Sequence, residues 1–467
     1  MGDAAGLLED VAVASVLRSA LATGGGFAEV YAEHRRGRSL RLDDTKVEEV
    51  TSGVDCGAGI RVVRDGRTAY AYTNVLTRAS LEEAAAVAAA GVGGQSGARV
   101  ADLVTVRPPV THPPARDPFE ADRPRLVDVV TRADEAARSV DASVRQATVR
   151  WADSHQDVLV ANSEGHRSTE RRVRCRIVVQ VVAARDGVVQ TGMESPGGSV
   201  GLELLDEHPP EQVGRLAAQR AVEMLDAESA PAGELAVVLG PGSGGVLFHE
   251  ACGHGMEADL VAKGASVYAG RRGERVGTSA LTGVDDATVL GGWGSFGFDD
   301  EGTPAQRTVL FADGVCTDYL TDRLRARELE LPRSGNGRRQ SYAHLPVPRM
   351  TNTFILPGAD DPAEIVRGVR RGVYCDELGG GQVDTTSGDF VFGVAQAHMI
   401  EGGRLTRPIR GANLVGDGPT VLARIEAVGS DFGMRQGVCG KEGQGVPAGL
   451  GNPTLLVGRL TVGGTSR

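Results

Sequence analysis

Apolar residues follow two different spacings in the first part of the chain. Over residues 5–22 they recur at helical spacing, so that Leu7, Val11 and Leu17 lie on one side of a predicted helix. Residues 27–73 alternate in the manner of strands, with turn signals at 43–44 and 65–66. A second helix is predicted over residues 80–91, where Ser80 and Glu83 have the spacing of a capping box.

Helical and strand-like patterns continue to alternate after a connection that is rich in proline. Residues 105–124 contain six prolines and predict an extended segment. A third helix is expected over residues 125–140, followed by strands over 143–200 with a hairpin turn at Asp186-Gly187. A fourth helix is expected to begin at Pro209-Pro210 and to end near Asp226.

The pattern changes at residues 227–233, which we predict to be the domain boundary. Beyond them glycine is dense, long helical patterns are few, and short strand patterns recur, for example at 308–311, 373–375, 388–394 and 454–457. The sequence therefore predicts an α+β fold with two domains. An N-terminal α/β domain covers residues 1–230, and a sheet-rich C-terminal domain covers residues 231–467 and carries one important helix near Ser243.

Length and charge narrow the class of protein. A chain of 467 residues exceeds what one core usually spans, which agrees with two domains. The net charge of −11 argues against nucleic acid as a partner, because binding phosphates needs a surplus of basic residues. No run of 18 apolar residues predicts a membrane span, and the first residues lack a signal-peptide pattern. We therefore expect a cytoplasmic protein with no membrane partner, whose six scattered cysteines are reduced.

The predicted helix near Ser243 carries a motif of metal-dependent hydrolysis. It reads His249-Glu250-Ala-Cys-Gly-His254, in which two imidazoles could bind a metal while Glu250 handles the proton of the attacking water. The two His are five residues apart, so in a regular α-helix their rings would point about 140° apart. A π-bulge would realign them, and Gly253 would weaken the regular helix, so we predict a distorted turn across residues 249–254. The alternative is an accidental pair of surface histidines.

A catalytic zinc needs a third protein ligand and one open position. The candidates are another His, a carboxylate such as Glu257, or a cysteine. Cys252 lies within the motif, whereas Cys439 stands in a glycine-rich segment where Lys441 would favour the thiolate. Glu257 could also act as a hydrogen-bond partner of His254 rather than as a ligand. A fourth protein ligand would instead make the zinc site purely structural, and spacing alone does not choose among these alternatives.

Many segments in the same order resemble one family. They are residues 52–61, 67–72, 249–259, 298–302, 334–339, 348–352, 383–389, 410–413 and 439–444. On these segments the chain resembles the TldD/PmbA (TldD/TldE) proteins, and because it has the H-E-x-x-x-H motif it resembles the TldD-type subunit. The resemblance implies Zn²⁺ on His249, His254 and Cys439, with Glu250 as catalytic base and Cys252 as a packing residue. It also implies a PmbA/TldE-like homologous subunit as partner around an enclosed cavity, although self-association is an alternative.

These features predict a zinc-dependent endopeptidase that hydrolyses unfolded or flexible peptides within an enclosed cavity. Glycine-flanked strands could accept an extended peptide by strand addition. Arg349 or Asn352 could bind the peptide, or could equally fix loop conformation. The acidic run 299–301 is expected to be a solvated turn rather than a cation site, and residues 384–389 are expected to be a turn and strand cap. The alternative function is a non-catalytic regulator, a modulator of DNA gyrase or of a toxin–antitoxin system.

Overall fold

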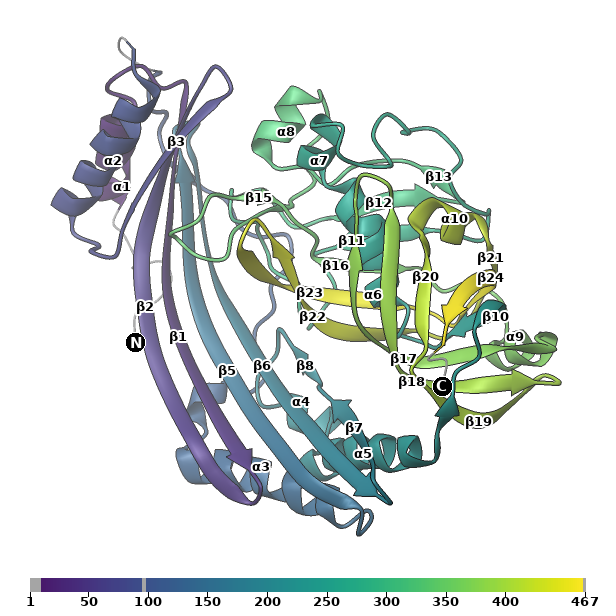
Figure 1. Cartoon of the computed structure of the whole chain (residues 1–467). Helices are drawn as coiled ribbons and strands as arrows, with labels where there is room; N and C mark the ends of the chain where they lie inside the picture. The colour runs from purple at the N-terminus through teal and green to yellow at the C-terminus, as the bar shows by residue number, and fades with distance from the viewer. Residues whose placement is uncertain (1–9, 95–97, 465–467) are drawn as a thin grey trace.

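The structure is a computed structural model that describes residues 10–94 and 98–464. It confirms the α+β class: long curved strands form one side of the molecule, and several shorter sheets form the other (Figure 1). The predicted helix over residues 5–22 is present as α1 (Asp10–Ala20), and residues 5–9 of that prediction lie outside the described ranges.

One mixed sheet holds the strands of the first half of the chain. Its order is β3-β2-β1-β5-β6-β4, with β7 and β8 also paired to β6. The hairpin turns predicted at 43–44, 65–66 and 186–187 all join antiparallel strands of this sheet. The strands are β1 (Phe27–Asp43), β2 (Lys46–Arg64), β3 (Arg67–Thr73), β4 (Val104–Thr105), β5 (Val144–Asn162), β6 (His166–Arg185), β7 (Val188–Glu194) and β8 (Gly197–Gly198).

The long strands carry a separate apolar core toward each end. At one end Val30, Ile60 and Leu159 pack with helices α1 and α2 (Arg78–Val92). At the other end Trp151 and Ile177 pack with α3 (Arg123–Arg138) and α5 (Pro210–Glu223), beside the short α4 (Leu204–Glu207). Between these two cores, the middle of the strands presents polar and charged side chains toward the C-terminal half of the chain.

The predicted capping box of the second helix is wrong. The N-cap of α2 is Thr77, whose hydroxyl accepts the backbone N–H of Ser80, so the helix begins one residue after Thr77. Thr77 and Ser80 are both residue types that cap helices well. Which of them becomes the N-cap depends on where the chain leaves the preceding strand. The proline-rich connection is extended apart from a 3₁₀ turn at Pro118–Glu120.

Two sheets and one large apolar core make up the C-terminal half. The first sheet has the order β17-β10-β24-β20-β18-β19-β9, with β21 against β24, and the second has the order β13-β12-β11-β16-β23-β22. A single cluster of buried residues, including Phe248, Phe311 and Phe392, joins them. The strands are β9 (Glu228–Ser229), β10 (Gly233–Leu239), β11 (Gly283–Asp286), β12 (Arg307–Ala312), β13 (Val315–Cys316), β16 (Asn352–Ile355), β17 (Arg371–Val383), β18 (Asp389–Glu401), β19 (Arg404–Arg410), β20 (Asn413–Asp417), β21 (Ile425–Val428), β22 (Gly433–Lys441), β23 (Gln444–Asn452) and β24 (Leu455–Gly463).

Short helices and turns connect these sheets. The helices are α6 (Gly245–Phe248), α7 (Ala258–Ala262), α8 (Arg323–Glu328), α9 (Pro362–Gly368) and α10 (Gly418–Ala423), and β14 (Gly337–Arg338) pairs with β15 (Val347–Pro348). Asp384 and Asp389 accept hydrogen bonds within their turn, as expected. The domain boundary after residue 230 stays a prediction. No helix in the two described ranges is long and apolar enough to cross a membrane.

Candidate metal centre and active site

The turn across the His-Glu-His motif is a π-helical turn, as the spacing predicts. Helix α6 leads directly into a π turn over His249–Gly253, in which the backbone N–H of His254 donates to the carbonyl of His249. A 3₁₀ turn over His254–Met256 follows. Gly253 serves packing here, because a Cβ at this position would lie 2.1 Å from Sδ of Met350. The rings of His249 and His254 therefore approach each other, with centroids 5.1 Å apart.

Cys439 reaches the same point from a distant part of the chain. It lies on β22 opposite Val446 of β23, and its side chain is buried. Ligand-type atoms of His249, His254 and Cys439 all lie within 4.8 Å of one another, and Sγ of Cys439 is 3.8 Å from Nε2 of His254. We call these three residues the donor cluster. Among the described residues it is the one group of three or more His, Cys, Asp or Glu side chains with such spacing.

The side chains of the donor cluster shift one another's pKa values. Burial alone would raise the pKa of the Cys439 thiol, but the neighbouring His249 and His254 outweigh it and hold that pKa well below its ordinary value. Burial alone would lower the pKa of His254, but Glu257 and Cys439 raise it well above its ordinary value. The thiol is thus stabilised as a thiolate, the form that binds metals.

Glu257 is a partner of His254 rather than a member of the donor cluster. Its Oε2 lies 2.9 Å from Nδ1 of His254, which leaves Nε2 of that ring facing Cys439. Burial raises the pKa of Glu257, but His254 and Lys441 outweigh it and lower the pKa to about 2. Lys441 donates to Glu257 at 3.0 Å and to Asp259 at 2.6 Å. Lys441 thus contacts the carboxylate that orients His254, and the expectation that it favours the thiolate stays a prediction.

The donor cluster fits a zinc ion in three respects. Nδ1 of His249 is buried and has no hydrogen-bond partner in the part of the chain that the structure describes. Two imidazoles and a thiolate are the ligand types that zinc prefers. Ordinary Zn–N and Zn–S lengths at a tetrahedral angle place N and S about 3.6 Å apart, close to the observed 3.8 Å.

The remaining members of the motif differ in exposure. Glu250 keeps 32% of its side chain exposed, and its Oε2 is 3.7 Å from Nε2 of His254, so a carboxylate stands at the open side of the donor cluster. Cys252 is fully buried in the apolar core, where Tyr268 donates to its sulfur and burial raises its pKa to about 12. A neutral thiol in that position serves packing.

Arg349 and Asn352 are both completely buried. The Arg349 guanidinium donates to the carbonyls of Cys439 and Gln444, the latter at 3.4 Å. The Asn352 amide donates to the carbonyl of Asp286 at 2.7 Å and accepts the backbone N–H of Gly294 at 3.0 Å. These contacts are those expected of the loop-fixing alternative, and Arg349 in particular holds the hairpin that carries Cys439.

The acidic run 299–301 is buried, which contradicts the expected solvated turn. The reason lies in arginines that come from elsewhere in the sequence. Glu301 pairs with Arg61 at 2.5 Å, Arg61 pairs with Glu29 at 2.9 Å, and Glu29 pairs with Arg339 at 2.6 Å. We call these four residues the paired network. It joins strands β1 and β2 to the C-terminal half, with Asp300 bound to Arg172 at 2.7 Å beside it.

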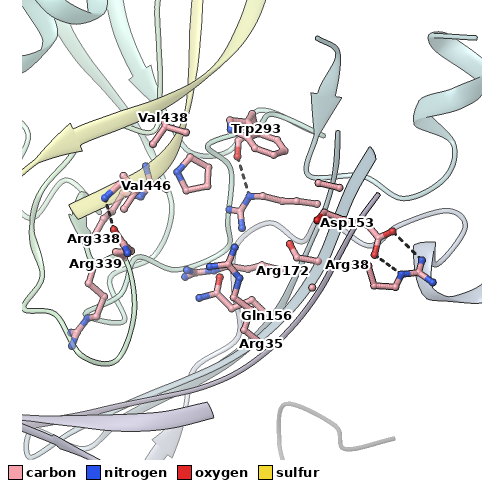
Figure 2. Close-up of a pocket in the computed structure, with 18 of the residues that line it drawn as sticks. Arg35, Arg38, Asp153, Gln156, Arg172, Trp293, Arg338, Arg339, Val438 and Val446 are labelled. Atoms are coloured by element: carbon pink, nitrogen blue, oxygen red, sulfur yellow. Dashed lines mark hydrogen bonds and ion pairs between the residues drawn. The ribbon is translucent and has the colours of Figure 1, made fainter. Parts of the chain in front are cut away.

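A pocket of about 440 Å³, not predicted from the sequence, lies beside the donor cluster. Figure 2 shows Val438 and Val446 of the β22–β23 hairpin on one side of the pocket, and Arg35, Arg38 and Gln156 of the long strands on the opposite side. The alternation of arginine with apolar residues over 172–177 of β6 was a usable signal, because it places several guanidiniums on one face of a strand.

An α+β fold with a buried imidazole–thiol cluster defines a candidate metalloprotein, and comparisons with known proteins show its family. The family descriptions PmbA/TldA metallopeptidase domain 1, central domain and C-terminal domain match residues 28–91, 116–225 and 232–464. The chain therefore belongs to the PmbA/TldD metallopeptidase family.

Two curated relatives and two solved structures extend this comparison. A Metalloprotease TldD homolog from Haemophilus influenzae is 36% identical over 94% of this chain and 93% of its own length. A metalloprotease from Methanothermobacter thermautotrophicus is 36% identical over 94% and 96%. The structure of TldE from Thermococcus kodakarensis superposes with a TM-score of 0.79 at 18% identity, covering 97% of this chain and 99% of that one. A Thermotoga maritima protein described as a candidate modulator of a DNA gyrase gives 0.78 at 22%, covering 94% and 96%.

Proposed function

We propose that the protein is a zinc-dependent endopeptidase of the TldD type that cleaves unfolded or flexible peptides. The observation that carries the proposal is the convergence of His249, His254 and Cys439 beside the half-exposed carboxylate of Glu250. Three protein ligands leave one position of a tetrahedral site open, which is the arrangement of catalytic rather than structural zinc.

Each residue of the site has a separate task in this proposal. His249, His254 and Cys439 hold the zinc, and Glu257 fixes the ring of His254 through its 2.9 Å contact with Nδ1. When bound, zinc lowers the pKa of water and polarises a substrate carbonyl. Glu250 accepts the proton of the attacking water and passes it to the departing amine. Its partial exposure gives it access to both groups.

The position of Cys439 supports an extended peptide as substrate. β22 is the outermost strand in the order of its sheet, so its outer edge has no partner strand in the described ranges. A peptide added along this edge would form main-chain hydrogen bonds and pass the donor cluster, because Cys439 belongs to β22. Only a segment without fixed structure can pair in this way. A PmbA/TldE-type homologous subunit would enclose the cavity and exclude folded proteins.

The substitution Glu250→Gln tests the proposal. We expect it to lower kcat for a flexible fluorogenic peptide by about 10²–10⁴-fold, because it removes the proton acceptor and keeps the shape of the side chain. The zinc content and the thermal unfolding temperature should stay unchanged. Glu207→Gln, at an exposed position outside the site, is the matched control and should keep full activity. Unchanged hydrolysis by zinc-loaded Glu250→Gln would overturn the proposal and favour a binding protein.

A further inference from the structure

The arginine pocket lies directly beside the path proposed for the substrate. One of its walls is the β22–β23 hairpin, where Val438 precedes Cys439 and Val446 pairs with it. The other wall is the polar middle of strands β1, β5 and β6. A peptide bound along β22 would therefore place one of its ends or side chains next to this pocket (Figure 2).

The pocket has more arginines than the neighbouring carboxylates neutralise. Six arginines line it: Arg35, Arg38, Arg172, Arg174, Arg338 and Arg339. Two carboxylates, Asp153 and Asp300, also line the pocket, and both are already engaged. From outside the lining, Glu170 pairs with Arg172 at 3.0 Å and Glu29 pairs with Arg339 at 2.6 Å. Asp153 accepts two hydrogen bonds from Arg38, at 3.0 and 2.9 Å. Asp300 accepts from Arg172 at 2.7 Å and from the backbone of Arg339 at 2.8 Å.

Two of these guanidiniums are buried without a carboxylate partner in the described ranges. Arg174 is 8% exposed and donates only to the carbonyls of Trp293 at 3.2 Å and Ser295 at 3.5 Å. Arg338 is 4% exposed, donates to the carbonyl of Met350, and lies 5.3 Å from the ring of Phe296. Asp300 acts on Arg338, and Glu170 on Arg174, without forming an ion pair. Burying a cation without a directly paired counter-charge is costly, so these positions favour an anion supplied by a ligand.

The electrostatics of Arg174 agree with this geometry. Burial, with the neighbouring Arg172 and Arg338, lowers the pKa of Arg174 to about 9. Arg35 is an exposed residue of the pocket lining and has no hydrogen bond or ion pair to the residues that the structure describes. It is therefore free to contact an incoming group.

We infer that this pocket binds a carboxylate of the peptide substrate. The inference rests on the proposed peptidase function, because it takes the ligand to be the peptide on β22. Guanidiniums match carboxylates in shape and form charge-assisted hydrogen bonds. The carboxylate has two sources, the C-terminus of the peptide and an acidic side chain, and the protein would prefer peptides that carry either one.

Binding of four related peptides tests the inference. One flexible fluorescent sequence is made with Glu or Gln at one position, each with a free C-terminus or a C-terminal amide. Affinities are measured by fluorescence anisotropy on the zinc-loaded Glu250→Gln protein, so the readout does not depend on cleavage. We expect the peptide with the preferred carboxylate to bind about tenfold or more tightly than the uncharged peptide. A preference for the free C-terminus identifies the α-carboxylate, and a preference for Glu identifies the side chain.

Variants of the pocket connect the preference to its arginines. Arg174→Gln should abolish the preference, and Arg35→Gln, which cannot disturb a core because Arg35 is exposed, should reduce it about threefold. Arg370→Gln, at an exposed position outside the pocket lining, removes the same charge and should leave the preference unchanged. Equal binding of all four peptides, or a preference that survives in both pocket variants, would overturn the inference. If the preference is found but the wild-type protein cleaves none of the peptides, the proposed peptidase function is wrong, whereas the inference that the pocket binds a carboxylate still holds.

Discussion

The donor cluster and the paired network are both buried, yet their atoms are used in opposite ways. In the paired network each charged group meets an opposite charge, as in the 2.6 Å pair of Arg339 with Glu29. In the donor cluster, Nδ1 of His249 lacks any hydrogen-bond partner in the described ranges, and the sulfur of Cys439 faces the two imidazoles. The charged groups of the paired network already neutralise one another inside the fold. The donor atoms of the donor cluster lack such partners and remain available to a ligand. The paired network therefore stabilises the fold, whereas the donor cluster is the one that we propose to bind metal.

Breaking the paired network should have the largest effect on stability. Glu29→Gln removes the carboxylate that accepts from both Arg61 and Arg339, and leaves buried guanidiniums without a full counter-charge. We expect the free energy of unfolding to fall by about 3–5 kcal/mol, measured by chemical denaturation. Metal content should not change, because the network is separate from the donor cluster. The exposed control Glu48→Gln should stay within about 0.5 kcal/mol of wild type.

Two results would contradict the separation between a paired network that stabilises the fold and a donor cluster that binds metal. One is a loss of zinc from folded Glu29→Gln, since it would mean that the network also orders the donor cluster. The other is a denaturation midpoint equal to wild type, which would show that the buried pairs contribute nothing to stability.

Changing Glu257 should act on metal affinity instead of stability. Glu257→Gln weakens the contact that orients His254, and such partners of metal ligands usually contribute 10–100-fold in affinity, or about 1.4–2.7 kcal/mol. Competition with a chromophoric chelator measures this change. Asp259→Asn is the control, because Asp259 shares Lys441 with Glu257 but, within the described ranges, makes no hydrogen bond or ion pair with His254. Equal affinities in the two variants would show that Glu257 does not orient the ring.

The fold was largely predictable where local pattern decides it. Turn sequences such as Asp65-Gly66 and Asp186-Gly187 predict hairpins, because the two strands of a hairpin lie next to the turn in sequence. The π turn was predicted from the five-residue spacing of His249 and His254, on the hypothesis that both bind one metal, and from Gly253 between them. The cap of α2 was missed by one turn, since Thr77 and Ser80 are chemically equivalent candidates.

The candidate site was predictable only in its local part. Cys439 is distant in sequence from the histidines, so its glycine-rich segment made it one candidate beside Glu257 and Cys252, and only the family resemblance selected it. The acidic run 299–301 was misjudged because its arginine partners come from other strands. The arginine pocket was missed for the same reason: β6 and the β22–β23 hairpin meet only in three dimensions.

A half-exposed cluster of charges should have the smallest effect. His398 contacts Asp376 at 2.7 Å and Glu223 at 2.9 Å, which links α5 to β17 and β18. The Asp376 hydrogen bond, against a lowering effect of burial, raises the pKa of His398 to about 9. Because the folded pKa is raised, the stabilisation is complete below pH 6.5 and is lost as the pH rises through 9. We expect a loss of about 1 kcal/mol after discounting for solvent screening.

Denaturation midpoints at pH 6 and pH 9.5 measure this loss. His398→Gln should show a smaller decline over the same interval, because it removes the group that titrates. An identical decline in the variant and in wild type would assign the pH dependence to other groups.

The most direct test of the account is the metal content of Cys439→Ala beside that of Cys252→Ala, determined on purified protein by elemental analysis. Both cysteines are buried in the C-terminal half, but only Cys439 belongs to the donor cluster. We expect about one zinc per chain in wild type and in Cys252→Ala, and far less than one in Cys439→Ala. Stoichiometric zinc retained in Cys439→Ala would contradict the central claim that this thiol and the two imidazoles form one metal centre.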